Sequence, residues 1–135
     1  FMFGYDNVHS VVVNIADHQA DGTLPIWKVP TRFAKIGILE AWASCDTTIK
    51  DGVGTAIWLN LVNRGGAGTG TATDVSAVLG ATGTGDWTAT VPRNFSISEG
   101  TMDGGDYLCL GYNEVGTVAP LNITVGFSYV SGVGA

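Results

Sequence analysis

Strict alternation of apolar and polar residues over short runs is the feature that most constrains how this chain can fold. In the run 121–130, LNITVGFSYV, large apolar residues alternate with small or polar ones: Ile123, Val125, Phe127 and Tyr129 against Asn122, Thr124, Gly126 and Ser128. The run 55–63, TAIWLNLVN, likewise places Ile57, Leu59 and Leu61 on one side. A period of two predicts a β-strand with one buried face and one solvated face. Both runs are therefore predicted strands.

Similar short runs, rich in β-branched and aromatic residues, recur along the chain with Gly, Asp and Asn between them. They cover 8–16, 24–30, 32–45, 74–80, 86–92, 94–98 and 105–113. No segment combines a helical period with capping residues. About eight strands at this spacing predict an all-β chain, a single antiparallel β-sandwich of the jelly-roll or immunoglobulin-like type. We assign residues 11–135 to the sandwich and residues 1–10 to a candidate N-terminal arm.

Two of the runs carry positional signals. The run 24–30 contains two prolines, which favour an edge strand because proline cannot donate to a sheet. The run 32–45 is apolar on both faces, which predicts either a central strand or a pair of strands broken near Gly37. Its alternation puts Ile36, Ile38 and Trp42 on the same side. We therefore expect Trp42 in the core.

The low charge content limits the partners of the chain. Only 13% of the 135 residues are charged, about half the usual ~25%, and the formal net charge is −6 with six Lys and Arg. So few cations argue against nucleic-acid binding, and no apolar run approaches the ~20 residues that span a membrane. Either Ser, Thr, Asn and Gly solvate the surface, or part of it is buried against other subunits. We favour burial against other subunits.

The glycine-rich stretch 61–74, LVNRGGAGTGTATD, is the segment most similar to a ligand-binding loop. A phosphate-binding P-loop requires Lys and then Ser or Thr after its last glycine, but Thr71 and Ala72 stand there. A dinucleotide fingerprint requires a third glycine at the position of Thr71 and a helix after it. Both motifs fail at the residues that would contact the ligand. The stretch is predicted to be a flexible connection between strands.

No catalytic, metal or cofactor site is predicted, and the chain is not expected to be an enzyme. Its two histidines, His9 and His18, lie near the amino end, with no G-x-S-x-G nucleophile motif elsewhere and no zinc-ligand spacing. The acidic stretch DGGD, residues 103–106, lacks the further oxygen ligands of a calcium loop and predicts a turn. Cys45 and Cys109 both lie in apolar runs and are interpreted as buried free thiols, with a disulfide as the alternative.

The four tryptophans, Trp27, Trp42, Trp58 and Trp87, are more typical of core and interface anchors than of a sugar-binding platform. Trp58 falls on the same face as Asn60, opposite the apolar side of its strand. We expect it to be exposed or covered by a neighbouring subunit.

Several landmarks together resemble a known family. The pattern W-x-x-P at Trp27–Pro30, the pattern G-D-x-L-x-L at Gly105–Leu110 and the alternating run Leu121–Tyr129 occur in the same order in small all-β auxiliary virion proteins of tailed bacteriophages, of the capsid decoration or cement type. The resemblance covers most of residues 20–132.

The resemblance implies a non-enzymatic structural protein on the capsid surface of a virion, assembled in the host cytoplasm. Its partners would be the major capsid protein and copies of itself, with a trimer as the favoured oligomer. The candidate contact residues are Phe1, Phe3 and Tyr5 in the arm and Trp27 and Trp58 between subunits. Two alternatives remain: a tail, baseplate or head-fibre component, and a carbohydrate-binding module or adhesin tip that uses exposed tryptophans.

Overall fold

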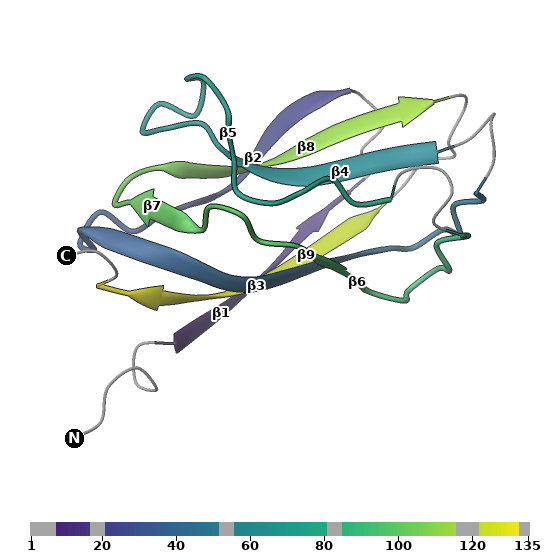
Figure 1. Cartoon of the computed structure of the whole chain (residues 1–135), viewed down its shortest axis with the longest axis horizontal. Coiled ribbons are helices and arrows are strands. Elements are labelled where there is room, and N and C mark those ends of the chain that lie inside the picture. Colours follow the sequence, from purple (N-terminus) through teal and green to yellow (C-terminus); the bar gives the residue numbers. More distant parts are fainter. Residues whose placement is uncertain (1–7, 17–20, 52–55, 81–84, 116–121, 133–135) are drawn as a thin grey trace.

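The chain folds into two layers of antiparallel strands, as the sequence predicts (Figure 1). The computed structural model describes residues 8–16, 21–51, 56–80, 85–115 and 122–132. The described part of the chain contains no helix long and apolar enough to cross a membrane. Its strands are β1 (Val8–Ile15), β2 (Gly22–Lys28), β3 (Lys35–Cys45), β4 (Ala56–Asn63), β5 (Thr73–Asp74), β6 (Arg93–Phe95), β7 (Thr101–Asp103), β8 (Tyr107–Val115) and β9 (Ile123–Ser131).

The strand order identifies the sandwich as a jelly roll. Sheet A has the order β1-β9-β3-β6, with β7 also paired to β3, and sheet B has the order β2-β8-β4-β5. The pairings are nested: β1 with β9, β2 with β8, β3 with β6 and β7, and β4 with β5. Nested pairs of this kind form when one long hairpin rolls up so that its pairs fall alternately in two sheets. The connectivity thus decides between the two sandwich types that the sequence left open.

The core lies between the two sheets and follows the predicted alternation. On β9, Ile123, Val125, Phe127 and Tyr129 are buried, and on β4 the same holds for Ile57, Leu59 and Leu61. The predicted edge strand is also confirmed, since β2 lies at one edge of sheet B and is irregular between Pro25 and Trp27. Residues 86–92, by contrast, form no strand: Trp87 makes an isolated bridge to Ile49, and its ring is buried.

The longest predicted run forms one central strand, but with a change of phase. β3 pairs with β9 on one side and with β6 and β7 on the other. Its register with β9 shifts between Ile38 and Glu40, and a bulge there turns every later side chain to the opposite face. The inward residues of β3 are therefore Ile36, Ile38, Ala41, Ala43 and Cys45. The predicted core position of Trp42 is wrong, because this residue follows the bulge and points outward.

The two cysteines are free and buried, and they lie in different sheets, Cys45 on β3 and Cys109 on β8. Cys45 is 1% exposed and Cys109 is 0% exposed. Burial raises the pKa of the Cys45 thiol to about 12 and raises the pKa of the Cys109 thiol as well. The reactive thiolate is therefore scarce at neutral pH in both.

We expect neither thiol to react with Ellman's reagent in the folded protein, because access and ionisation are both suppressed. In guanidinium chloride, both of the two cysteines of the chain should react. The measurement is the absorbance released per chain before and after denaturation. Rapid release of one equivalent from the folded protein would contradict the burial described above.

The Asp46 carboxylate connects the ends of two neighbouring strands, β3 and β9, at one end of sheet A. Asp46, which follows β3, accepts hydrogen bonds from the backbone N–H of Asn122 at 3.0 Å and from its side-chain amide at 2.7 Å. The first of these contacts lowers the pKa of the Asp46 carboxyl below its usual value. The charged form is thus favoured by folding, and its contribution to stability is lost as the pH falls through the lowered pKa.

Replacing Asp46 by Asn should lower the melting temperature at pH 7, since the charge-assisted contacts to Asn122 are weakened. The difference from the unmodified protein should shrink as the pH is taken below about 4, where the unfolded carboxyl is already protonated. Thermal unfolding followed by circular dichroism at matched pH values tests this. A difference that stays constant down to acid pH would contradict it.

Candidate binding surfaces

Of the five residues predicted to contact other subunits, the structure describes two, Trp27 and Trp58. Phe1, Phe3 and Tyr5 lie outside the described residues. Trp27 packs between the sheets, with its ring centroid 5.0 Å from that of Phe127 and 4.9 Å from that of Tyr129. Trp58 lies half-buried on the outer face of sheet B, as its alternation predicts. For both tryptophans, contact with another subunit remains a prediction.

The outer face of sheet A carries little charge over β1, β9 and the part of β3 that follows the bulge, whereas Lys35, before the bulge, forms an ion pair with Asp103 of β7. We call the part with little charge the sheet A face, and it consists of these outward side chains: Val8, Ser10, Val12 and Asn14 of β1, Thr124, Gly126, Ser128 and Val130 of β9, and Glu40, Trp42 and Ser44 of β3. Glu40 is the only charged residue of this set. Val12, on the edge strand β1, is 61% exposed. A partly apolar surface with so little charge is typical of contact with another protein.

Trp42 forms the aromatic centre of the sheet A face and lies flat on the neighbouring strand. Its partner in the register is Gly126 of β9, and a Cβ at that position would overlap the indole ring. Glycine is therefore needed at residue 126 for close approach of a side chain.

Among the described residues, no strand covers the edge of sheet A at β1. Within the described residues β1 pairs only with β9, so one side of this eight-residue strand has unpaired backbone groups. Proteins usually protect such edges with Lys, Pro or a very short strand. The edge strand β2 of sheet B contains Pro25, and β5 has only two residues, whereas β1 reads VHSVVVNI. The β1 edge is thus available for pairing with another chain.

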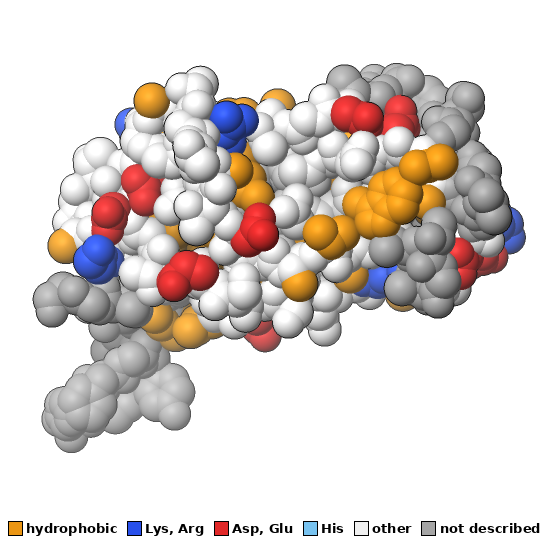
Figure 2. Space-filling model, turned by 45° about the horizontal axis from the view of Figure 1, so that its top comes forward, with side chains coloured by type: hydrophobic (Ala, Val, Ile, Leu, Met, Phe, Trp, Pro, Cys, Tyr) orange, Lys and Arg blue, Asp and Glu red, His pale blue; other side chains and the backbone are white. Residues whose placement is uncertain are grey.

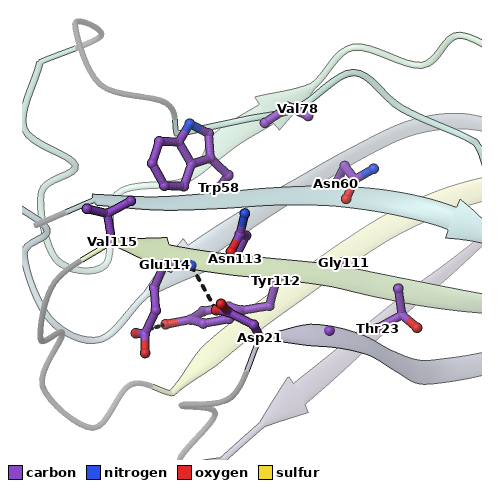
Figure 3. Close-up of a pocket in the computed structure, with 11 residues that line it drawn as sticks. Asp21, Thr23, Trp58, Asn60, Val78, Gly111, Tyr112, Asn113, Glu114 and Val115 are labelled. Atoms are coloured by element: carbon purple, nitrogen blue, oxygen red, sulfur yellow. Dashed lines mark hydrogen bonds between the residues drawn. The ribbon is translucent and has the colours of Figure 1, made fainter.

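A groove of about 660 Å³ crosses the outer face of sheet B. Its lining comes from β2, β8 and β4 and from residues just outside them (Figure 3). Trp58, Val78 and Val115 form an apolar end, while Thr23, Asn60 and Asn113 supply polar groups. In the space-filling view an apolar patch on this side lies close to acidic side chains (Figure 2).

The hollow depends on Gly111 at the middle of the groove. This residue pairs with Asn60 across β8 and β4, and a Cβ at residue 111 would overlap the Asn60 side chain. The Asn60 side chain therefore lies directly over the backbone of Gly111. Because residue 111 has no side chain, the groove is deeper at this point.

The end of the groove near β2 is acidic. Asp21 accepts a hydrogen bond from the backbone N–H of Glu114 at 3.0 Å, and Glu114 accepts one from the Tyr112 hydroxyl at 3.0 Å. Burial, together with the nearby Glu114 carboxylate, raises the pKa of Tyr112, so this phenol stays protonated and remains a donor. No Lys or Arg is among the described residues that line the groove. Glu114 and Tyr112 extend from β8 to the side away from Trp58 and Asn113 (Figure 3), so the carboxylates border the β2 end of the groove, and its outer face presents amide groups rather than cations.

The glycine-rich stretch connects β4 to β5 and rises above sheet B (Figure 1). It is a connection between strands, as the sequence predicts, and Arg64 makes several hydrogen bonds within it. The Arg64 guanidinium donates to the carbonyl of Gly70 at 2.8 Å, to the carbonyl of Thr69 at 3.2 Å and to the Thr23 hydroxyl at 2.5 Å. The loop is thereby closed on itself and tied to β2.

Gly111 and Gly126 both shape the surface, and neither was predicted from the sequence to do so. An isolated glycine inside a strand pattern is a known sign of close approach by another group, so the signal was present in each strand. His9, for which the sequence predicts no catalytic or metal role, stacks on Tyr129 with ring centroids 4.9 Å apart. The described residues hold no group of three or more His, Cys, Asp or Glu placed to bind a metal ion.

Two solved structures resemble this chain along most of its length. A chain of the capsid of Ralstonia phage GP4 is 16% identical, with a TM-score of 0.62, and the match covers 93% of this chain and 85% of that chain. A chain of the cyanophage Pam1 capsid asymmetric unit is 14% identical, with a TM-score of 0.54 and coverage of 94% and 85%. No family model and no curated protein matches the sequence. At these identities the likeness shows a shared jelly-roll fold.

Replacing Gly126 by Val should force the Trp42 ring off the sheet A face. We expect the free energy of unfolding to fall by about 1–3 kcal/mol, as for other overpacked sites, and tryptophan emission to shift to longer wavelength. Chemical denaturation and fluorescence measure both effects. Ser128→Val is the control, because residue 128 is on the same side of β9 and borders a small hollow. Unchanged emission and stability in Gly126→Val would contradict the packing of Trp42 on residue 126.

Proposed function

We propose that this chain is a non-enzymatic structural protein of a tailed-phage virion that binds the outer capsid lattice and stabilises it. The observation that carries the proposal is the nearly uncharged sheet A face, bordered by the open β1 edge. A protein that stays monomeric in solution rarely exposes a surface and a strand edge of this kind. Burial in an assembly explains both features.

The likeness to phage capsid chains supports the proposal. The matches cover more than nine tenths of this chain and 85% of each phage chain, so the chains compared are of similar length. The shared fold therefore extends over the whole of a small chain and is not confined to one domain of a large one. The low content of charged residues, 13%, points the same way.

We assign the contacts as follows. The sheet A face lies on the major capsid protein, because a broad face on which Glu40 is the one charged residue suits burial over a large area. The β1 edge pairs with a neighbouring copy of the chain, in a homo-oligomer for which a trimer is favoured. Residues 1–7 precede β1 directly and extend the contact as an arm. The protein would occupy the capsid surface after assembly in the host cytoplasm.

Replacing Val12 by Glu should strongly weaken binding to capsids, because it places a charge on the β1 side of the buried contact. Val12 is 61% exposed in the single chain, so the fold should be unaffected. Val78→Glu is the matched control, since Val78 is 58% exposed but lies beside the groove of sheet B. Co-sedimentation with capsids purified without the protein should fall about tenfold or more for Val12→Glu only. Added salt should change the binding little, because few charges are involved.

Equal binding by both variants would refute the assignment of the sheet A face. Deletion of residues 1–7 tests the arm separately and should weaken binding while leaving the circular dichroism spectrum unchanged. Copy number in purified particles tests the wider proposal. Tens to hundreds of copies on the capsid are expected, whereas a few copies on the tail would contradict a capsid role.

A further inference from the structure

We propose that the groove on sheet B binds a neutral oligosaccharide. This inference goes beyond the proposed function and does not depend on it, because the groove and the sheet A face lie on opposite outer faces of the sandwich. It stands on the shape of the groove, the nature of its side chains and the sign of its charge.

The shape fits a short chain molecule. At about 660 Å³ the groove has the volume of sites that take ligands larger than a single sugar. It lies open on the surface of the sheet, and strands β2, β8 and β4 contribute side chains in turn along it (Figure 3). An open groove of this form admits an internal stretch of a polymer as readily as its end.

Trp58 supplies the apolar surface that a sugar ring requires. One face of a pyranose ring carries mainly C–H groups, which pack on the flat face of an aromatic ring, while its hydroxyls remain free at the edge. The indole of Trp58 is only half-buried, and Val78 and Val115 extend the apolar end of the groove beside it. A half-exposed tryptophan in a hollow is well suited to such stacking.

Amide groups next to Trp58 suit the hydroxyls of a sugar. A side-chain amide can donate and accept at once, which matches a hydroxyl group that does the same. Asn113 points from β8 into the groove, and its side chain makes no hydrogen bond to another residue of the described part of the chain. Asn60 makes only a long contact of 3.4 Å to Asp74. Both amides are therefore available to a ligand.

The charge of the groove selects for neutral ligands. Asp21 and Glu114 are among the lining residues, and no cation among the described lining residues balances them. The nearby Arg64 donates to Thr69, Gly70 and Thr23 and thus stays with the glycine-rich loop. A phosphate, a nucleic acid or a uronic acid polymer would be repelled, whereas carboxylates accept hydrogen bonds from neutral hydroxyls.

The test uses the full chain and defined probes. Hexasaccharides of β-1,4-linked glucose, xylose, mannose and N-acetylglucosamine serve as neutral ligands, and hexagalacturonate serves as the anionic control. Isothermal titration calorimetry and tryptophan fluorescence are recorded for each. We expect saturable binding and a change in emission with at least one neutral hexasaccharide and none with hexagalacturonate.

Variants then locate the site. Trp58→Ala should weaken binding about tenfold or more, as loss of a central aromatic contact does, and Asn113→Ala should weaken it by a smaller factor. Trp42→Ala is the matched control, because it removes a half-buried tryptophan from the opposite face and should leave affinity unchanged. Val78→Glu is a second, independent variant, which places a charge at the apolar end of the groove and should also weaken binding. Circular dichroism confirms that each variant is folded.

Three results would overturn the proposal: no saturable binding of any neutral hexasaccharide, equal binding of hexagalacturonate, or unchanged affinity in folded Trp58→Ala and Val78→Glu. If Trp58→Ala instead changes the oligomeric mass and no sugar binds, Trp58 is a subunit contact, as the sequence predicts. None of these outcomes affects the capsid test, which depends on Val12 on the other face.

Discussion

Each sheet is held together by a central strand from the last third of the chain, β8 in sheet B and β9 in sheet A. β8 lies between β2 and β4 in sheet B, and β9 lies between β1 and β3 in sheet A. Neither sheet can close before these strands arrive, so the contacts that hold the sandwich together join residues far apart in sequence. Such topologies fold slowly, because the entropy of closing long loops is lost before the contacts form. The strict alternation of β9 follows from its one face in the core and its other face on the outside of sheet A.

Alternation predicted most of the architecture from sequence. It placed the inward residues of β4 and β9 correctly and gave an all-β sandwich, and the prolines near β2 marked an edge. It failed in β3, where one extra residue at the bulge near Leu39 reverses the faces and brings Trp42 to the surface. Gly37, two residues before Leu39, is a local sign of a break in the strand, but it does not give the residue at which the bulge lies. Its position is set by pairing with β9.

The candidate site was less accessible to sequence reasoning. The outward direction of Trp58 could be predicted from one strand alone. The groove could not, because it joins β2, β8 and β4, whose adjacency follows from strand order and not from any one segment. The glycine-rich stretch shows the same limit. Its composition indicates slack, yet the hydrogen bonds of Arg64 to Thr69, Gly70 and Thr23 give it a defined form.

The separation of the two outer faces has a consequence for how strongly the groove must bind. A subunit attached to a large particle by its sheet A face would turn sheet B toward the solvent, together with every other copy. Many grooves would then meet one surface that carries repeated sugars, and each contact after the first would form at a high effective concentration. Weak affinity in each groove would suffice for firm attachment of the whole particle. It would also leave single contacts free to break and re-form, so that the particle could move along such a surface without leaving it.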